Sequence, residues 1–95
     1  MGTLRQRIIE LLSQEPLDAV QLAQALGVRE KELFDHLPHI ARSVGARRGG
    51  LRMRPASCRN CGFEFKERRR LSPPGRCPRC GQSRIDGPWY YITGM

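Results

Sequence analysis

Hydrophobic positions in the first part of the chain recur at helical spacing. Between Thr3 and Gln14, four apolar side chains fall at i, i+4, i+7 and i+8: Leu4, Ile8, Leu11 and Leu12. This spacing predicts an amphipathic helix with one buried stripe. Thr3 and Gln6 have the spacing of a capping box, which marks the helix start, and Pro16 follows its end.

A second, shorter helix is expected from about Asp18 to Leu26. Asp18 and Gln21 repeat the capping-box spacing, and Gly27 follows as a residue that can adopt a left-handed cap conformation. The expected buried side chains are Val20, Leu22, Ala23 and Leu26.

A third helix is expected from about Arg29 to Leu37, with Leu33, Phe34 and Leu37 facing inward. Pro38 predicts a break, followed by a fourth helical segment from His39 to Val44. Two short helices joined by a turn that contains glycine are typical of a helix-turn-helix. A plain three-helix bundle fits the same periodicity.

Two strands are expected after the helices. Leu51-Arg52-Met53-Arg54 alternates apolar and basic residues, and Trp89-Tyr90-Tyr91-Ile92-Thr93 is rich in aromatic and β-branched residues. The two strands are natural antiparallel partners, so residues 56–88 would be an insertion at the tip of their hairpin. The alternation also places Arg52 and Arg54 on one strand face, with Leu51 and Met53 on the other.

Four cysteines lie within the expected insertion. Cys58-Arg59-Asn60-Cys61-Gly62 and Cys77-Pro78-Arg79-Cys80-Gly81 are two copies of Cys-x-x-Cys-Gly, with 15 residues between the inner cysteines. Two such turns facing each other complete a tetrahedral four-sulfur shell for one structural Zn²⁺, with no position left for water. Iron fits four thiolates as well, and a disulfide within each pair, as in a redox sensor, is another alternative.

The chain resembles a small prokaryotic family of predicted transcriptional regulators, in which a winged helix is fused to a rubredoxin-like zinc ribbon. The resemblance rests on the Ile8-Ile9-Glu10-Leu11-Leu12 helix through Leu37, Arg54-Pro55-Ala56, Cys61-Gly62-Phe63 and the closing strand. It implies an α+β fold in which the zinc ribbon is inserted in the wing or replaces it. Residues 1–55 with the closing strand 89–93 would form the winged helix-turn-helix, and residues 56–88 the ribbon. The metal ligands would be Cys58, Cys61, Cys77 and Cys80.

The charge is polarised along the chain. The net charge is +8, but residues 1–41 carry −2 and the remaining residues carry +10. All the bases except Lys31 and Lys66 are arginines, whose planar guanidinium suits phosphate, so a polyanion is the expected partner. The candidate nucleic-acid contacts are Arg29, Lys31, Arg47, Arg48, Arg52, Arg54, Arg68, Arg69 and Arg70.

The third helix is a poor phosphate reader, because Glu30, Glu32 and Asp35 outnumber its two bases, Arg29 and Lys31. The basic residues of the strand and the ribbon are the better candidates. Taken one at a time, each arginine fits a solvated surface charge better than a contact, and only the set as a whole favours a polyanion.

These features together predict a DNA-binding transcriptional regulator that binds double-stranded DNA, is not an enzyme, and works in the cytoplasm. No apolar run reaches membrane-spanning length and no signal peptide is evident, so no membrane contact is expected. A homodimer that binds two half-sites is compatible with the sequence. The alternatives are a module that binds a protein, an RNA or a polymerase through its acidic helices and basic ribbon, and an electron carrier with iron.

Overall fold

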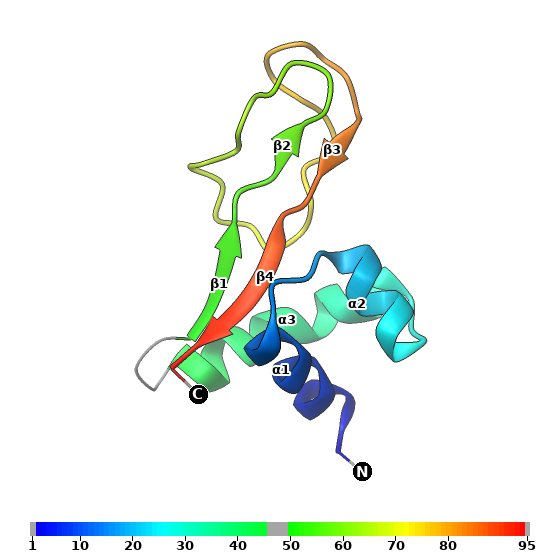
Figure 1. Cartoon of the computed structure of the whole chain (residues 1–95), viewed down its shortest axis with the longest axis vertical. Coiled ribbons are helices and arrows are strands. Elements are labelled where there is room, and N and C mark those ends of the chain that lie inside the picture. Colours follow the sequence, from blue (N-terminus) through cyan, green and yellow to red (C-terminus); the bar gives the residue numbers. More distant parts are fainter. Residues whose placement is uncertain (1, 46–49, 95) are drawn as a thin grey trace.

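The computed structural model describes residues 2–45 and 50–94 and has two lobes along its long axis (Figure 1). The helical lobe contains the helices and a two-stranded sheet, and the cysteine lobe (residues 55–88) contains two short strands and long loops. The helices are α1 (Leu4–Gln14), α2 (Ala19–Leu26) and α3 (Glu30–Gly45). The strands are β1 (Gly50–Arg54), β2 (Ser57–Cys58), β3 (Ile85–Asp86) and β4 (Trp89–Thr93). The fold class is α+β, with small antiparallel sheets.

Both predicted helix starts are confirmed. The Thr3 hydroxyl accepts a hydrogen bond from the Gln6 amide at 3.2 Å, and the Gln6 side chain accepts one from the Thr3 amide at 3.0 Å. Asp18 and Gln21 make the same reciprocal pair at 2.8 and 2.9 Å. Gly27 ends α2 in the left-handed conformation, as expected.

The predicted break at Pro38 is wrong, because α3 runs without interruption from Glu30 to Gly45. Proline lacks the amide that would bond to the Phe34 carbonyl, but its ring lies on the exposed side of the helix. The buried residues on either side of it form one continuous apolar stripe, made of Leu33, Leu37, Ile40 and Val44. Packing of that stripe offsets the missing hydrogen bond, since tertiary contacts supply most helical stability in proteins.

The core of the helical lobe lies between the helices and one face of the β1–β4 sheet, with α1 packed on β4 and α3 on β1. The expected burial of Val20 is wrong, because this side chain is 50% exposed. The buried positions of α2 are Ala19, Leu22, Ala23 and Leu26, and Val20 lies beside that stripe. Phe34, expected to face inward, is only half-buried.

The predicted pairing of the two longer strands is confirmed. β1 and β4 are antiparallel, with Leu51 opposite Ile92 and Met53 opposite Tyr90 on the face toward the helices. The opposite face carries the pairs Arg52–Tyr91 and Arg54–Trp89. On its other side β4 has a single bridge, between Tyr90 and Leu17. In the part of the chain that the structure describes, β1 is therefore an edge strand.

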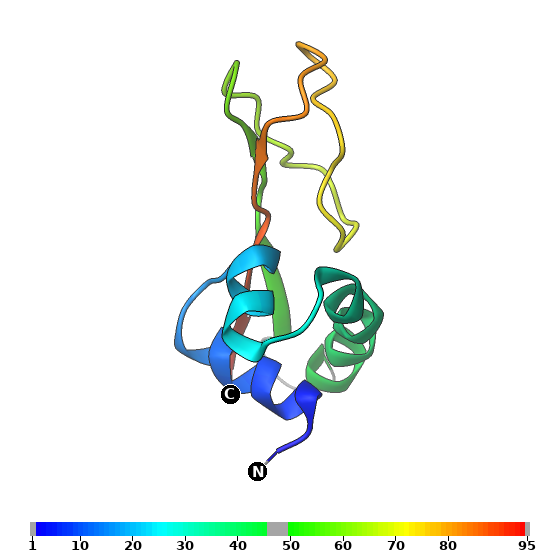
Figure 2. The same cartoon turned by 90° about the vertical axis from the view of Figure 1, so that its right-hand side faces the viewer.

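The cysteine lobe continues directly from this sheet. β1 leads into β2 and β3 leads into β4, so residues 56–88 extend from the end of the hairpin, as Figures 1 and 2 show. Figure 2 also shows one loop of this lobe turning back toward the helices. No helix among residues 2–45 and 50–94 has the length and apolar character needed to cross a membrane.

Candidate metal centre and nucleic-acid interface

The two Cys-x-x-Cys-Gly motifs form the same tight turn. In each, the amide of the first cysteine, Cys58 or Cys77, donates to the carbonyl five residues later at 2.8 Å. The glycine amide, from Gly62 or Gly81, donates to the carbonyl of that first cysteine at 2.9 Å. The glycines have φ angles of 79° and 78°, a conformation that strains other residues, which explains why both motifs end in glycine.

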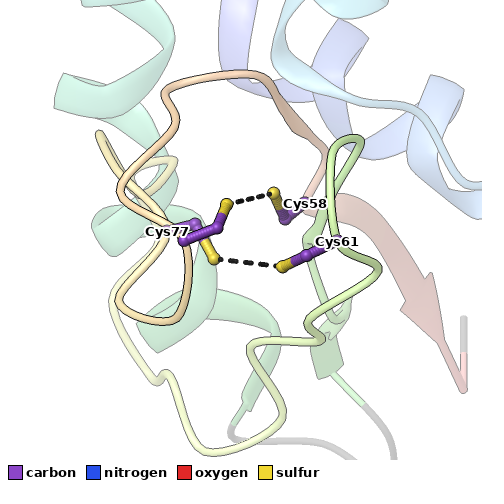
Figure 3. Close-up of side chains that lie close together, drawn as sticks. Cys58, Cys61 and Cys77 are labelled. Atoms are coloured by element: carbon purple, nitrogen blue, oxygen red, sulfur yellow. Dashed lines mark hydrogen bonds between the residues drawn. The ribbon is translucent and has the colours of Figure 1, made fainter.

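The turns face each other and bring four sulfur atoms together (Figure 3). Cys58 Sγ lies 3.6 Å from Cys80 Sγ, and Cys61 Sγ lies 3.6 Å from Cys77 Sγ. All four sulfurs lie within 4.8 Å of one another. In a tetrahedral site with Zn–S bonds of about 2.3 Å the sulfurs are about 3.8 Å apart, so the cluster fits one structural Zn²⁺. All four thiols are free, and neither motif holds a disulfide.

Hydrogen bonds already favour one thiolate of the cluster. The Gln82 amide and the Asn60 side chain lower the pKa of Cys80 to about 6. The Phe63 amide acts in the same direction on Cys61, but desolvation and the neighbouring thiols outweigh it and raise the pKa of Cys61 to about 11. Without a cation, the site therefore does not hold four thiolates near neutral pH. A divalent metal deprotonates the thiols that coordinate it, so the difference in pKa between Cys80 and Cys61 no longer matters once the metal is bound.

The cysteine lobe has very little apolar core of its own. Apart from Pro74 and Pro88, the buried apolar residues there are Ala56, Cys58 and Cys77, and none belongs to the core cluster of the helical lobe. Phe63 and Phe65 pack edge to face, with ring centroids 5.0 Å apart, but both side chains are half exposed. Structural zinc in small modules contributes on the order of 10 kcal/mol to folding, which is enough to replace such a core.

The arginine loop (residues 66–72) is anchored to the helical lobe. Tyr90 is fully buried and donates its hydroxyl to the Leu71 carbonyl, while the Leu71 side chain packs against the core. Within the loop, Arg68 donates from Nη2 and Nε to the Ser72 carbonyl at 3.0 and 3.2 Å. Desolvation raises the pKa of Tyr90 well above its usual value, so the hydroxyl remains protonated and able to donate. These contacts hold the loop beside β1.

A hollow of about 610 Å³ lies between the arginine loop, β1 and α3. We call it the basic hollow, because its charged lining residues are Arg52, Lys66, Arg68, Arg69 and Arg70. No carboxylate from the described ranges lines it. These cations come from two separate segments of the sequence, β1 and the arginine loop, and the fold brings them together.

The candidate nucleic-acid residues divide into two groups. Arg52, Arg68, Arg69 and Arg70 line the basic hollow, and Arg54 lies on the same exposed face of β1 as Arg52. The remaining described candidates, Arg29 and Lys31, are exposed at the start of α3 and do not line this hollow. Arg47 and Arg48 lie outside the described residues.

The start of α3 has an acidic setting. Glu30 lines a separate hollow of about 320 Å³ between α2 and the cysteine lobe, which we call the acidic hollow because Asp18 and Asp86 line it as well. The cation in that lining is Arg59, which forms an exposed ion pair with Asp86 at 2.6 Å. The structure therefore separates the basic hollow from the acidic face of the helices.

Sequence reasoning missed the anchor of the arginine loop and gave Asn60 no role. The alternation in β4 places Tyr90 on the buried face, and a buried phenol needs a hydrogen-bond acceptor. The sequence therefore contains the signal that Tyr90 is buried and needs an acceptor. The acceptor, Leu71, lies 19 residues earlier, and no local signal marks it.

Comparison with known proteins accounts for almost the whole chain. Residues 3–53 match the family model "PF0610-like, N-terminal", and residues 55–93 match the "PF0610 rubredoxin-like zinc beta-ribbon domain". The solution NMR structure of protein PF0610 from Pyrococcus furiosus is similar, with a TM-score of 0.81 and 31% sequence identity, over 100% of this chain and 94% of that one. Among curated proteins none matches.

The zinc-ribbon match covers all four cysteines of the sulfur cluster, so the family assignment favours zinc over iron at this site. The cluster has zinc-like dimensions, and the two family models meet at the junction between β1 and the cysteine lobe. The chain belongs to the PF0610-like family and carries that family's rubredoxin-like zinc ribbon.

Proposed function

We propose that this protein is a DNA-binding transcriptional regulator that binds duplex DNA mainly through β1 and the arginine loop. In this proposal the helical lobe is a winged helix, and the β1–β4 hairpin with the cysteine lobe takes the place of the wing. The protein acts by binding and is not an enzyme. The zinc is structural, because four sulfur ligands leave no position for a reacting water.

The observation that carries this proposal is the anchored arginine loop beside β1. Arginines on a free loop are commonly solvated surface charges, but here Tyr90 and Leu71 fix the loop to the core. The cations therefore stay close together without a partner, and a polyanion does not have to order the loop when it binds. Clustered arginines that face a row of phosphates release counterions, which supplies most of non-specific DNA affinity.

In this proposal α3 contributes little to the attraction for phosphate. Its first turn exposes Glu30 and Glu32 beside Lys31, and its N-terminus borders the acidic hollow. A glutamate can accept a hydrogen bond from a cytosine amino group, so base contacts by α3 are compatible with the proposal. They would act after the basic surface has brought the DNA close.

The test compares two double variants of the zinc-loaded protein, each of which loses two arginines. R52A/R54A removes two exposed cations from β1, and R5A/R7A removes two exposed cations from α1. We expect R52A/R54A to weaken binding to duplexes of any sequence, and to lower the salt dependence of log K by about 1.8, since each phosphate contact contributes about 0.9. The α1 variant should retain the salt dependence of the wild type.

Equal losses in the two variants would contradict the proposal, because only net charge would then matter. A change in base preference when Lys31 or Glu32 is replaced, together with no effect of R52A/R54A, would move the interface to α3. Fluorescence anisotropy with several unrelated duplexes of equal length measures both quantities.

A further inference from the structure

The outer edge of β1 carries unpaired backbone groups. Tyr90 uses both its amide and its carbonyl on Leu17, at 2.8 and 3.0 Å. Met53 lies directly opposite Tyr90, so this pair is one that does not exchange hydrogen bonds between the two strands. The amide and carbonyl of Met53 therefore point away from β4, and so do those of Leu51, two residues earlier. In the described residues these groups have no backbone partner.

The basic hollow borders this free edge. Residues from both faces of β1 line it, with Leu51 and Met53 on the face toward the helices and Arg52 on the other face. On the side of the helices Ala41 of α3 and Leu71 of the arginine loop contribute apolar side chains, and Arg68, Arg69 and Arg70 of the same loop also line the hollow. The hollow therefore combines a row of free hydrogen-bonding groups with apolar side chains near Leu51 and Met53 and with cations from β1 and the arginine loop.

We infer that this edge binds an extended peptide in which apolar and acidic residues alternate, and that the peptide adds to β1 as an antiparallel strand. Side chains that lie opposite each other in antiparallel strands share one face of the sheet. Residues opposite Leu51 and Met53 would face the helices, where Ala41 and Leu71 offer apolar contacts, and the residues between them would meet Arg52 and Arg54. The chemistry of the two sides selects the alternation, and the free edge selects the extended backbone.

Charge decides between this occupant and a second copy of the chain. Two β1 strands pairing at their edges would place arginines next to arginines on the exposed face, and such like-charge contacts are destabilising. An acidic strand would instead place carboxylates next to the arginines of β1, and this contact is attractive. The inference goes beyond DNA binding. Peptide binding would use the free backbone groups of β1, whereas binding to phosphates would need only the arginine side chains.

The test uses one peptide in three forms with the zinc-loaded full chain. The probe is an acetylated and amidated octapeptide of alternating valine and glutamate. One control carries N-methyl groups on all four valines, and the other carries them on all four glutamates. All three peptides have the same side chains and charge, so only the free amides differ.

In the antiparallel arrangement the valine amides face β1 and the glutamate amides face solvent. We expect valine methylation to weaken binding by about tenfold, since it removes interstrand hydrogen bonds, and glutamate methylation to leave affinity unchanged. Hydrogen exchange of the Leu51 and Met53 amides should slow when the unmodified peptide binds.

Equal affinities for the three peptides would overturn the inference, because binding would then depend on charge alone. Unchanged exchange at Leu51 and Met53 with bound peptide would also overturn it. Absence of peptide binding, with single-stranded oligonucleotide binding lost in R52A/R54A, would assign the hollow to nucleic acid instead.

Discussion

Tyr90 connects the two lobes through one side chain. Its ring lies in the core beneath the helices, and its hydroxyl bonds to a carbonyl of the arginine loop. A buried acceptor that loses its donor costs about 1–3 kcal/mol, which is more than the net gain from an average hydrogen bond. The position of the arginines beside β1 therefore depends on a residue that touches none of the expected partners.

We predict that Y90F lowers the free energy of unfolding of the zinc-loaded protein by about 1–2 kcal/mol, because the Leu71 carbonyl loses its donor. Y91F is the matched control, and a half-buried tyrosine without a hydrogen-bond partner in the described chain should change stability by less than about 0.5 kcal/mol. Urea denaturation at neutral pH measures both. Similar losses in the two variants would contradict the assigned role.

The contribution of the Tyr90 hydroxyl to the free energy of unfolding depends on pH in a definite direction. The folded-state pKa of Tyr90 is raised above the ordinary value by burial. The contribution is therefore complete below the unfolded pKa of about 10 and is lost as pH rises above it. Y90F should remove that part of the alkaline loss of stability.

At the level of elements, the two lobes are stabilised in different ways. The helical lobe has a continuous apolar core, whereas the buried apolar residues of the cysteine lobe are one alanine, two prolines and two of the cysteines themselves. The short β2–β3 pair spans two residues on each strand and adds little. The metal centre is therefore the main stabilising feature of residues 56–88.

We predict that complete removal of zinc by a chelator unfolds residues 56–88 while α1, α2 and α3 remain folded. The reason is that the lost metal free energy is on the order of 10 kcal/mol and no apolar core replaces it. Two-dimensional NMR of the amides follows the lobes separately, and added zinc should restore the original spectrum. An unchanged spectrum for the cysteine lobe after full demetallation would contradict this assignment.

Features with local causes were predicted correctly from the sequence. The two capping boxes, the left-handed Gly27 after α2, and the alternation of β1 each depend on a few neighbouring residues. The errors at Pro38 and Val20 have tertiary causes, because the packing of a whole helix decides whether a proline is tolerated and which side chains are buried. The basic hollow could not be predicted, since residues far apart in sequence form it.

At the scale of the whole molecule, the charge polarisation of the sequence becomes a spatial separation. The basic hollow lies beside β1, and the acidic hollow lies between α2 and the cysteine lobe. A duplex that approaches the basic side gains from clustered arginines, while an approach to the start of α3 meets carboxylates. The net charge of +8 therefore understates the attraction on one side and overstates it on the other.

The salt dependence of duplex binding by the zinc-loaded wild-type protein tests the central proposal most directly. If β1 and the arginine loop together contact about four phosphates, log K should fall by about 3.6 for each tenfold rise in salt concentration. A slope near zero would contradict the proposal. So would a dissociation constant at low salt that is weaker than the usual non-specific range of about 10⁻⁴ to 10⁻⁶ M.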